Sequence, residues 1–303
     1  MTGLSLDSQI SDRAPLCAGP DPRPRRPTLS LPPGSCDCHA HICGPADTYR
    51  YAGTRIYTPP DALLPDYLAM LATLGIERAV IVQPSAYGTD NTVMLEALKT
   101  AAFALRGIAV IDRETVTDAE LARMNRAGVR GVRINLVDVA APSGELPLGP
   151  VRRLAERVAP LGWHVEFLMH VDDQPALDST FADFPTDIVL GHLGYMRPDK
   201  DPSEPGFQAL LRLMEGGRCW VKLTAPYRIT AGDLPYPNVT PTARALVEAA
   251  PDRLLWGSDW PHVMVTKPMP NDGDLCDLLA DWIQDADIRH KVLVENPARL
   301  YGF

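Results

Sequence analysis

The sequence predicts a (β/α)8 barrel, and two observations indicate this fold class. From residue 35 onward, short β-prone apolar runs alternate eight times with longer segments whose apolar residues recur at spacings of three and four. Such repeated alternation is typical of a closed parallel sheet surrounded by helices. The G-x-G-x-x-G turn of a dinucleotide-binding sheet is absent after the first run, so a doubly wound sheet is the weaker alternative.

Each expected strand is a run rich in β-branched and other apolar residues. In chain order these runs are SCDCHAH (35–41), RAVIVQPS (78–85), RGIAVID (106–112), GVRGVRINL (128–136), WHVEFLMH (163–170), DIVLGHLG (187–194), CWVKLTAP (219–226) and RLLWGSDWP (253–261). The clearest helices between them are PDYLAMLATLG (65–75), DAELARMNRAG (118–128) and GPVRRLAERVAPLG (149–162). Each of these helices ends at a glycine, which is a common helix stop signal.

The first 34 residues differ from the rest of the chain in composition. The stretch APLCAGPDPRPRRPTLSLPPG (14–34) is dense in proline and arginine, and such segments are extended and poor in helix or strand. We expect an extended arm over residues 1–34 and a single catalytic barrel domain over residues 35–303. The basic RPRRP stretch can contact a partner, although a solvated arm is the simpler expectation.

Composition excludes several classes of partner. The 29 Lys and Arg against 38 Asp and Glu give a net charge of −9, which argues against nucleic acid and anionic membranes. A small anionic substrate remains compatible, because a local basic pocket can outweigh a distant negative surface. Six cysteines do not form a secreted disulfide framework, and no signal peptide or membrane span is evident. We therefore expect a cytoplasmic protein, and the sequence leaves homo-oligomer formation open.

Polar side chains gather where the expected strands end. In a barrel of this class the chemistry lies at the carboxyl ends of the strands. The residues at these ends are His39, His41, Ser85, Arg133, Glu166, His170, His192, Arg228 and Asp259. Each alone has a structural explanation, such as a capping aspartate or a hydrogen-bonded core histidine. Their shared position at one rim favours a functional site.

Alternation along the first strand sorts its polar residues. A period of two places Asp37, His39 and His41 on one face and Cys36 and Cys38 on the other. If the histidines point into the barrel, the cysteines point toward the helices. A structural zinc site built from these cysteines and a histidine is therefore disfavoured.

The rim residues together suit hydrolysis of an activated carbonyl. Asp259 can take a proton from water as a general base. His39 and His41 can hold a divalent cation or polarise a carbonyl oxygen directly. The arginines provide forked donors for a carboxylate or sulfonate group. This set indicates attack by water on a carbonyl within an anionic molecule.

Several motifs in order resemble the amidohydrolase superfamily, and in particular its branch of metal-optional lactone hydrolases. The matching segments are DCHAH (37–41), RIYTPPDA (55–62), VIVQPSAYGTDN (80–91), GVRGVRIN (128–135), GHLG (191–194), VKLTAPYR (221–228) and LLWGSDWPH (254–262). An H-x-H pair alone is a weak signal, but its order with GHLG and GSDWP is fairly specific. The resemblance covers the chain from about residue 35 to the C-terminus.

The resemblance implies a distorted (β/α)8 barrel and a ring-opening hydrolysis. The expected substrate is an anionic lactone or pyrone from aromatic-compound breakdown, such as a pyrone dicarboxylate or a sulfomuconolactone. On the family pattern Asp259 activates the water, and His39, His41 and His192 complete the catalytic set. The substrate-binding positions that match the pattern are Tyr57, Ser85, Arg133 and Arg228. Two departures, NLVDVAAPSG (135–144) and EFLMH (166–170), leave the exact substrate open.

The need for a metal also stays open. The resemblance implies either no required cofactor or one divalent ion, zinc or manganese. The ligands of such an ion would be His39, His41, Glu166 and Asp259, with His170 as a further candidate. Lys222 is expected to form a buried ion pair rather than a carboxylated metal bridge. Two alternative reactions on the same scaffold are lactone isomerisation and metal-dependent decarboxylation.

Overall fold

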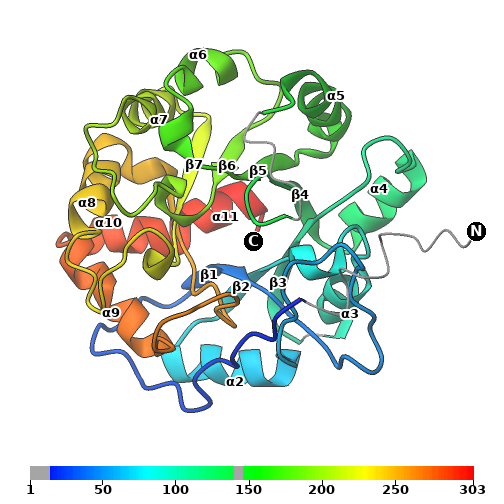
Figure 1. The fold of residues 1–303 in the computed structure, drawn as a ribbon, viewed down its shortest axis with the longest axis horizontal. Coiled ribbons are helices and arrows are strands. Elements are labelled where there is room, and N and C mark those ends of the chain that lie inside the picture. The colour runs from blue at the N-terminus through cyan, green and yellow to red at the C-terminus, as the bar shows by residue number, and fades with distance from the viewer. Residues whose placement is uncertain (1–13, 101, 140–145) are drawn as a thin grey trace, which may run out of the picture.

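The computed structural model describes residues 14–100, 102–139 and 146–303 and confirms the barrel (Figure 1). Eight parallel strands pair in chain order, from β1 to β8, with helices between them. The strands are β1 (Cys36–Ala40), β2 (Arg78–Val82), β3 (Ala104–Ala109), β4 (Val129–Asn135), β5 (His164–Leu168), β6 (Ile188–Leu190), β7 (Cys219–Leu223) and β8 (Leu254–Trp256). The helices are α2 (Leu64–Leu74), α3 (Thr92–Thr100), α4 (Asp118–Arg126), α5 (Leu148–Val158), α6 (Leu177–Phe181), α7 (Pro205–Glu215), α8 (Thr240–Ala249), α9 (Asp272–Trp282), α10 (Ala286–His290) and α11 (Asn296–Tyr301).

The barrel closes through the segment that follows β8. The backbone N–H of Asp259 donates to His39 O (2.8 Å), and the N–H of His41 donates to Trp260 O (2.7 Å). Strand β8 is only three residues long, so this seam is short and irregular. Closure therefore brings the end of β1 directly beside the residues that carry the last expected catalytic group.

The helices begin, end and pack as their sequences predict. Helix α4 has a capping box in which the side chain of Thr117 and that of Glu120 each bond the other's backbone N–H. Helix α2 ends at Gly75, whose φ of 81° suits glycine. The buried residues of α5 recur at spacings of three and four. One face of each helix thus packs against the outside of the barrel.

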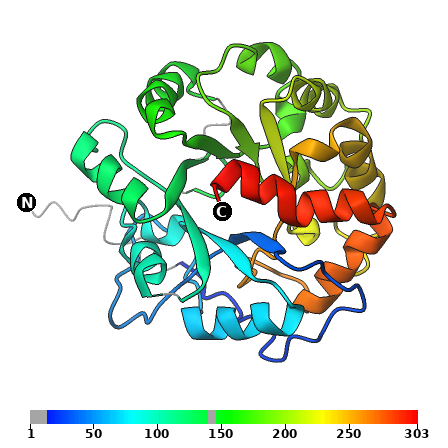
Figure 2. The ribbon, with the colours of Figure 1, turned by 180° about the vertical axis from the view of Figure 1, so that it is seen from behind.

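The C-terminal segment covers the amino ends of the strands (Figure 2). Helix α11 lies across this end, and Arg106 of β3 donates from Nε to Tyr301 O at 3.1 Å. The Tyr301 ring also meets the His164 ring of β5, with centroids 5.5 Å apart. Because this end is closed, the carboxyl ends of the strands are left for the candidate site.

The first strand departs from the predicted alternation. Cys36 and Cys38 lie inside the barrel in one apolar cluster with Val80, Val82, Ile108, Val189, Trp220, Leu255 and Tyr301. Asp37 points outward and accepts a hydrogen bond from Tyr67 OH of α2 at 2.9 Å. The β1–β2 register shifts between Asp37 and Ala40, and such a bulge re-aims the following side chain. The predictions that Asp37 and His39 share a face, and that the cysteines point toward the helices, were therefore wrong.

Residues 14–34 run along the outside of the barrel without a helix of their own. Cys17 N donates to Thr58 O (2.8 Å) near the carboxyl ends of the strands. Arg25 then pairs with Asp274 and Asp277 of α9. The first 13 residues of the predicted arm lie outside the described residues, and the boundary at residue 34 stays a prediction. None of the helices in the described part of the chain has the length and apolar run that crossing a membrane requires.

Candidate active site

The four residues predicted to be catalytic meet at the carboxyl ends of the strands. His39, His41, His192 and Asp259 are each at most 3% exposed. The ring centroid of His39 lies 5.0 Å from that of His41 and 5.2 Å from that of His192. Asp259 Oδ1 lies 3.5 Å from His39 Nε2 and 3.8 Å from His41 Nε2. One carboxylate oxygen therefore faces two imidazole nitrogens.

Two of these residues sit in unusual backbone conformations. His192 follows β6 with a φ of 52°, and Asp259 follows β8 with a φ of 65°. Non-glycine residues rarely adopt a positive φ, and such strain concentrates at functional sites. The tight turns after β6 and β8 thus aim both side chains back over the barrel.

The three histidines are neutral at neutral pH. Burial lowers the pKa of His39, and the Lys222 ammonium lowers it further. Burial, with the nearby His39 and Arg133, lowers the pKa of His41 to about 3. Burial also holds the pKa of His192 well below its ordinary value. Neutral imidazoles can each present one lone pair, which is the form that binds a metal.

His41 has a defined tautomer. Its Nδ1 lies 2.7 Å from Val82 O, and because a carbonyl only accepts, Nδ1 carries the proton. Nε2 therefore presents a lone pair toward Asp259 Oδ1, which has no hydrogen-bond partner among the described residues. Two facing acceptors need a cation, or a water that donates to both. The donor set thus fits a divalent ion as well as a bound water.

A tighter metal-compatible group is formed by His39, His192 and Asp259, whose ligand atoms all lie within 4.8 Å of one another. Zinc and manganese both accept such nitrogen and carboxylate ligands. This group differs from the set expected from sequence. His192 joins it, whereas His41, Glu166 and His170 do not.

Glu166 lies behind His39 instead of beside Asp259. Its Oε1 is 3.4 Å from His39 Nδ1, and its Oε2 pairs with Lys222 Nζ at 2.6 Å. Burial raises the pKa of Glu166, but Lys222 and His39 outweigh this and hold it well below its ordinary value. The expected buried ion pair of Lys222 is confirmed. The pair orients the His39 ring from its far side.

His170 is occupied elsewhere. Its ring stacks on Tyr195 with centroids 4.9 Å apart, and Nδ1 lies 2.5 Å from Tyr195 O. It therefore does not belong to the metal-compatible group.

The second carboxylate oxygen of Asp259 is hydrogen-bonded by two residues in the turn after β7. Oδ2 accepts from Tyr227 OH at 2.6 Å and from Arg228 Nε at 3.2 Å. Burial raises the pKa of Asp259, but Arg228 and the surrounding histidines outweigh this and keep the pKa below its ordinary value. Asp259 is therefore ionised, with one oxygen fixed and the other directed at the histidines.

Residues predicted to bind substrate surround the mouth of the site. Ser85 and Arg133 line a cavity of about 250 Å³, and Tyr57 is buried beside it, with its OH 3.4 Å from Ser85 Oγ. Arg228 lines an adjacent hollow of about 200 Å³ together with Tyr195. A cavity of this size can take the body of a small ring compound.

Comparison with known proteins identifies the family of this chain. The model of the amidohydrolase family matches residues 36–303. The chain belongs to the amidohydrolase family. A 4-sulfomuconolactone hydrolase of Rhizobium radiobacter is 39% identical over 290 residues, covering 95% of this chain and 96% of the relative. A 2-pyrone-4,6-dicarboxylate hydrolase of Comamonas testosteroni is 38% identical, covering 92% and 93%.

Solved structures give the same result for the fold of this amidohydrolase. The crystal structure of the Agrobacterium tumefaciens protein Atu3138 superposes with a TM-score of 0.82 at 28% identity, covering 91% of this chain and 98% of that one. The two chains thus share this fold over nearly their whole length.

The sequence analysis did not predict one buried hydrogen-bond network of this amidohydrolase. Tyr227 OH lies 3.1 Å from His262 Nδ1, and His262 Nε2 lies 3.1 Å from Asp272 Oδ1. Burial lowers the pKa of His262, but Asp272 and Asp259 outweigh this and raise it above its ordinary value. The signal was present, since His262 closes the GSDWPH segment.

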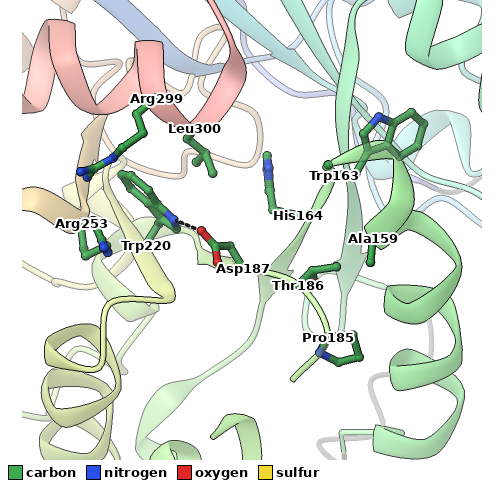
Figure 3. A pocket seen from close by; sticks show the side chains of 11 residues that line it. Ala159, Trp163, His164, Pro185, Thr186, Asp187, Trp220, Arg253, Arg299 and Leu300 are labelled. Carbon is green, nitrogen blue, oxygen red and sulfur yellow. Dashed lines mark hydrogen bonds between the residues drawn. The ribbon is translucent and has the colours of Figure 1, made fainter. Parts of the chain in front are cut away.

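A further cavity of this amidohydrolase, of about 340 Å³, lies at the amino ends of β5 to β8 (Figure 3). His164 and Thr186 line it, and their buried polar side-chain atoms have no hydrogen-bond partner among the described residues. None of the predicted site residues borders this cavity. It therefore plays no part in the candidate active site.

Proposed function

We propose that this chain is a hydrolase that opens the ring of an anionic lactone or pyrone through attack of water on the ring carbonyl. One observation carries the proposal: Asp259 Oδ1 is buried, without a hydrogen-bond partner among the described residues, and faces the Nε2 atoms of His39 and His41. The names of the relatives, a sulfomuconolactone hydrolase and a pyrone dicarboxylate hydrolase, support the same reaction.

In this proposal Asp259 acts as the general base. A water beside Oδ1 loses its proton to the carboxylate as its oxygen attacks the ring carbonyl. The bond between that carbonyl carbon and the ring oxygen then breaks, and the leaving oxygen takes the proton from Asp259, which returns to its carboxylate form. The Tyr227 and Arg228 contacts at Oδ2 hold the carboxylate in one orientation, so Oδ1 stays directed at the reacting centre.

The histidines carry the charge that develops on the carbonyl oxygen. His39, His41 and His192 converge on the same small volume. His39 and His192 can stabilise that oxygen by hydrogen bonding, since preorganised donors in a dry site are effective catalysts. His41, whose Nδ1 proton is used by Val82 O, can instead accept a hydrogen bond from the attacking water through Nε2. A divalent ion held by His39, His192 and Asp259 would supply the same polarisation as a Lewis acid. Both versions assign the base to the same aspartate and keep the same substrate class.

The anionic groups of the substrate are assigned to the mouth of the site. Arg133 and Ser85 line the cavity, and Tyr57 lies beside Ser85. Arg133 is 8% exposed, and its Nε has no hydrogen-bond partner among the described residues. A buried guanidinium with an unused donor is suited to bind a carboxylate or sulfonate.

The test is a hydrolysis screen of 2-pyrone-4,6-dicarboxylate, a sulfomuconolactone and a sugar-acid lactone, each with and without a chelator. Proton release and product identification report ring opening. We expect at least one of these rings to open, and Asp259→Asn to lower kcat roughly 100- to 10,000-fold while keeping the circular dichroism spectrum.

The matched control is Asp183→Asn, which removes an exposed carboxylate from an ion pair with Arg152 far from the site. It should leave kcat unchanged. Wild-type turnover in Asp259→Asn would contradict the proposed mechanism. Formation of a rearranged lactone in place of an open acid would identify an isomerase instead.

A further inference from the structure

Asp138 places a carboxylate in the mouth of a site that is proposed to bind an anion. Its Oδ2 lies 3.4 Å from Arg228 Nη1, and its Oδ1 accepts a hydrogen bond from Tyr195 OH at 3.3 Å. The Asp138 side chain is 14% exposed. Arg228 also pairs with Asp259 at 3.2 Å. Its positive charge is therefore already shared between two carboxylates of the protein.

The position of Asp138 is fixed by a turn at the end of β4. Asn135 Oδ1 accepts hydrogen bonds from the backbone N–H groups of Val137 (3.1 Å) and Asp138 (2.9 Å). Asn135 Nδ2 donates to Asp138 O at 3.3 Å. These three bonds form a closed local network. The carboxylate is thus held toward the site by its own backbone.

Asp138 stands on the border between the two hollows at the mouth. It lines the cavity of about 250 Å³ that Arg133 and Ser85 also line. Its two side-chain partners, Arg228 and Tyr195, line the adjacent hollow of about 200 Å³. The contacts of Asp138 therefore lie between the two spaces, and the lining of the larger cavity combines this carboxylate with basic side chains.

The basic side is formed by Arg133 and Arg55. Arg55 already bonds Thr58 Oγ1 at 3.1 Å and Ala52 O at 3.3 Å. Arg133 donates to Gln83 O at 3.2 Å, and no carboxylate among the described residues forms an ion pair with it. Arg133 can therefore bind one anionic group of the substrate. A second anion toward Arg228 would meet the Asp138 carboxylate.

We propose that Asp138 is a specificity-determining residue that limits the substrate to one anionic group. This inference rests on the proposed ring-opening function and narrows it. Arg133 holds the single anion, and Asp138 accepts a hydrogen bond from a hydroxyl group at the other side of the ring. A second carboxylate there is rejected, because like charges in a poorly solvated site repel each other strongly. The preferred class is a hydroxylated lactone with one carboxylate, such as a sugar-acid lactone.

The test compares kcat/KM for two probes in the wild type and in Asp138→Asn. The probes are a sugar-acid lactone with one free carboxylate and the dianion 2-pyrone-4,6-dicarboxylate. We expect the wild type to favour the monoanion. Asp138→Asn should raise kcat/KM for the dianion by about tenfold or more, and lower it for the monoanion, since its amide donates to a carboxylate and no longer repels it. The change for the dianion should appear mainly in KM.

The control variant is Asp178→Asn, which removes a carboxylate paired with Arg212 at 2.6 Å on the outside of the barrel. It should leave the ratio of the two kcat/KM values unchanged. Equal changes for both probes in Asp138→Asn, or a wild type that prefers the dianion, would overturn the role of Asp138. If the wild type opens neither ring nor any other lactone, the proposed function itself fails, which is a separate result.

Discussion

The hydroxyl of Tyr227 donates a hydrogen bond to Asp259 Oδ2 at 2.6 Å, and the two oxygens of that carboxylate therefore have different surroundings. Oδ2 faces donors from the turn after β7, whereas Oδ1 faces His39 and His41. A single hydroxyl proton serves one acceptor only. The proton on Tyr227 is used by Asp259, so His262 must donate to the Tyr227 oxygen from Nδ1.

The first prediction concerns Tyr227. Tyr227→Phe keeps the buried ring but removes the donor to Asp259, so the carboxylate is less firmly oriented. We expect kcat to fall about 10- to 100-fold with KM nearly unchanged, because a small misplacement of a general base is costly. Steady-state kinetics on whichever ring the screen identifies provide the measurement.

Tyr49→Phe is the matched control for Tyr227→Phe, because Tyr49 bonds Glu96 at the surface. It should retain wild-type kcat. Thermal unfolding of both variants separates a loss of chemistry from a loss of fold. A Tyr227→Phe variant with full kcat would show that Arg228 alone orients Asp259.

The second prediction concerns binding of added zinc, measured by calorimetry after chelator treatment. His192→Asn should abolish binding, since His192 belongs to the metal-compatible group. Glu166→Gln should weaken binding by roughly 10- to 100-fold, because Glu166 contacts the opposite nitrogen of His39. Cys38→Ser should have no effect, because Cys38 lies in the apolar cluster. Zinc binding that survives in His192→Asn but is lost in Cys38→Ser would refute the assignment.

The third prediction concerns the buried ion pair of Lys222 and Glu166, whose side chains are 0% and 2% exposed. Lys222→Met leaves Glu166 charged and unpaired in the barrel, which should cost about 3–5 kcal/mol of unfolding free energy. Adding Glu166→Leu to that variant should restore much of the loss, because the double variant buries no lone charge. Urea unfolding measures both. Strictly additive losses in the double variant would contradict this account.

Much of the fold and the meeting of the catalytic residues could be predicted because barrel geometry is periodic. His39, His192 and Asp259 lie far apart in sequence, yet parallel strands bring their carboxyl ends to one rim. The orientation of Glu166 could not be predicted in this way. Alternation shows that it faces inward, but only the Lys222 ammonium decides which way its carboxylate turns.

Local irregularity hid the remaining features from sequence reasoning. The register shift in β1 places His39 inside the barrel together with Cys36 and Cys38, which alternation assigns to the opposite face. Tyr227 and Asp138 follow strands β7 and β4 in turns, where side-chain direction depends on backbone angles; Ala225, with a φ of 48°, re-aims the segment that carries Tyr227. Strand periodicity does not extend into such turns. Their roles became visible only from contacts with Asp259 and Arg228.

The last prediction concerns Asp277, whose contacts with residues 14–34 should stabilise the protein to a degree that depends on pH. Its carboxylate accepts hydrogen bonds from the backbone N–H groups of Thr28 (3.1 Å) and Leu29 (2.8 Å) and pairs with Arg25. Burial raises the pKa of Asp277, but these bonds outweigh it and leave the pKa below its ordinary value of 3.8. Its contribution to stability is therefore complete above that value and is lost as the pH falls through the lowered pKa.

Asp277→Asn tests this by urea unfolding across a pH series. We expect the free energy of unfolding of the wild type to exceed that of the variant by about 1 kcal/mol at neutral pH. The difference is small because Arg25 is half-exposed, and solvent weakens its pairing with Asp277. That difference should shrink below about pH 4, as the wild-type carboxylate gains its proton. Asp47→Asn, which removes an exposed carboxylate, should track the wild type at every pH. A difference that persists unchanged into strong acid would mean that Asp277 holds the segment by packing instead of by charge.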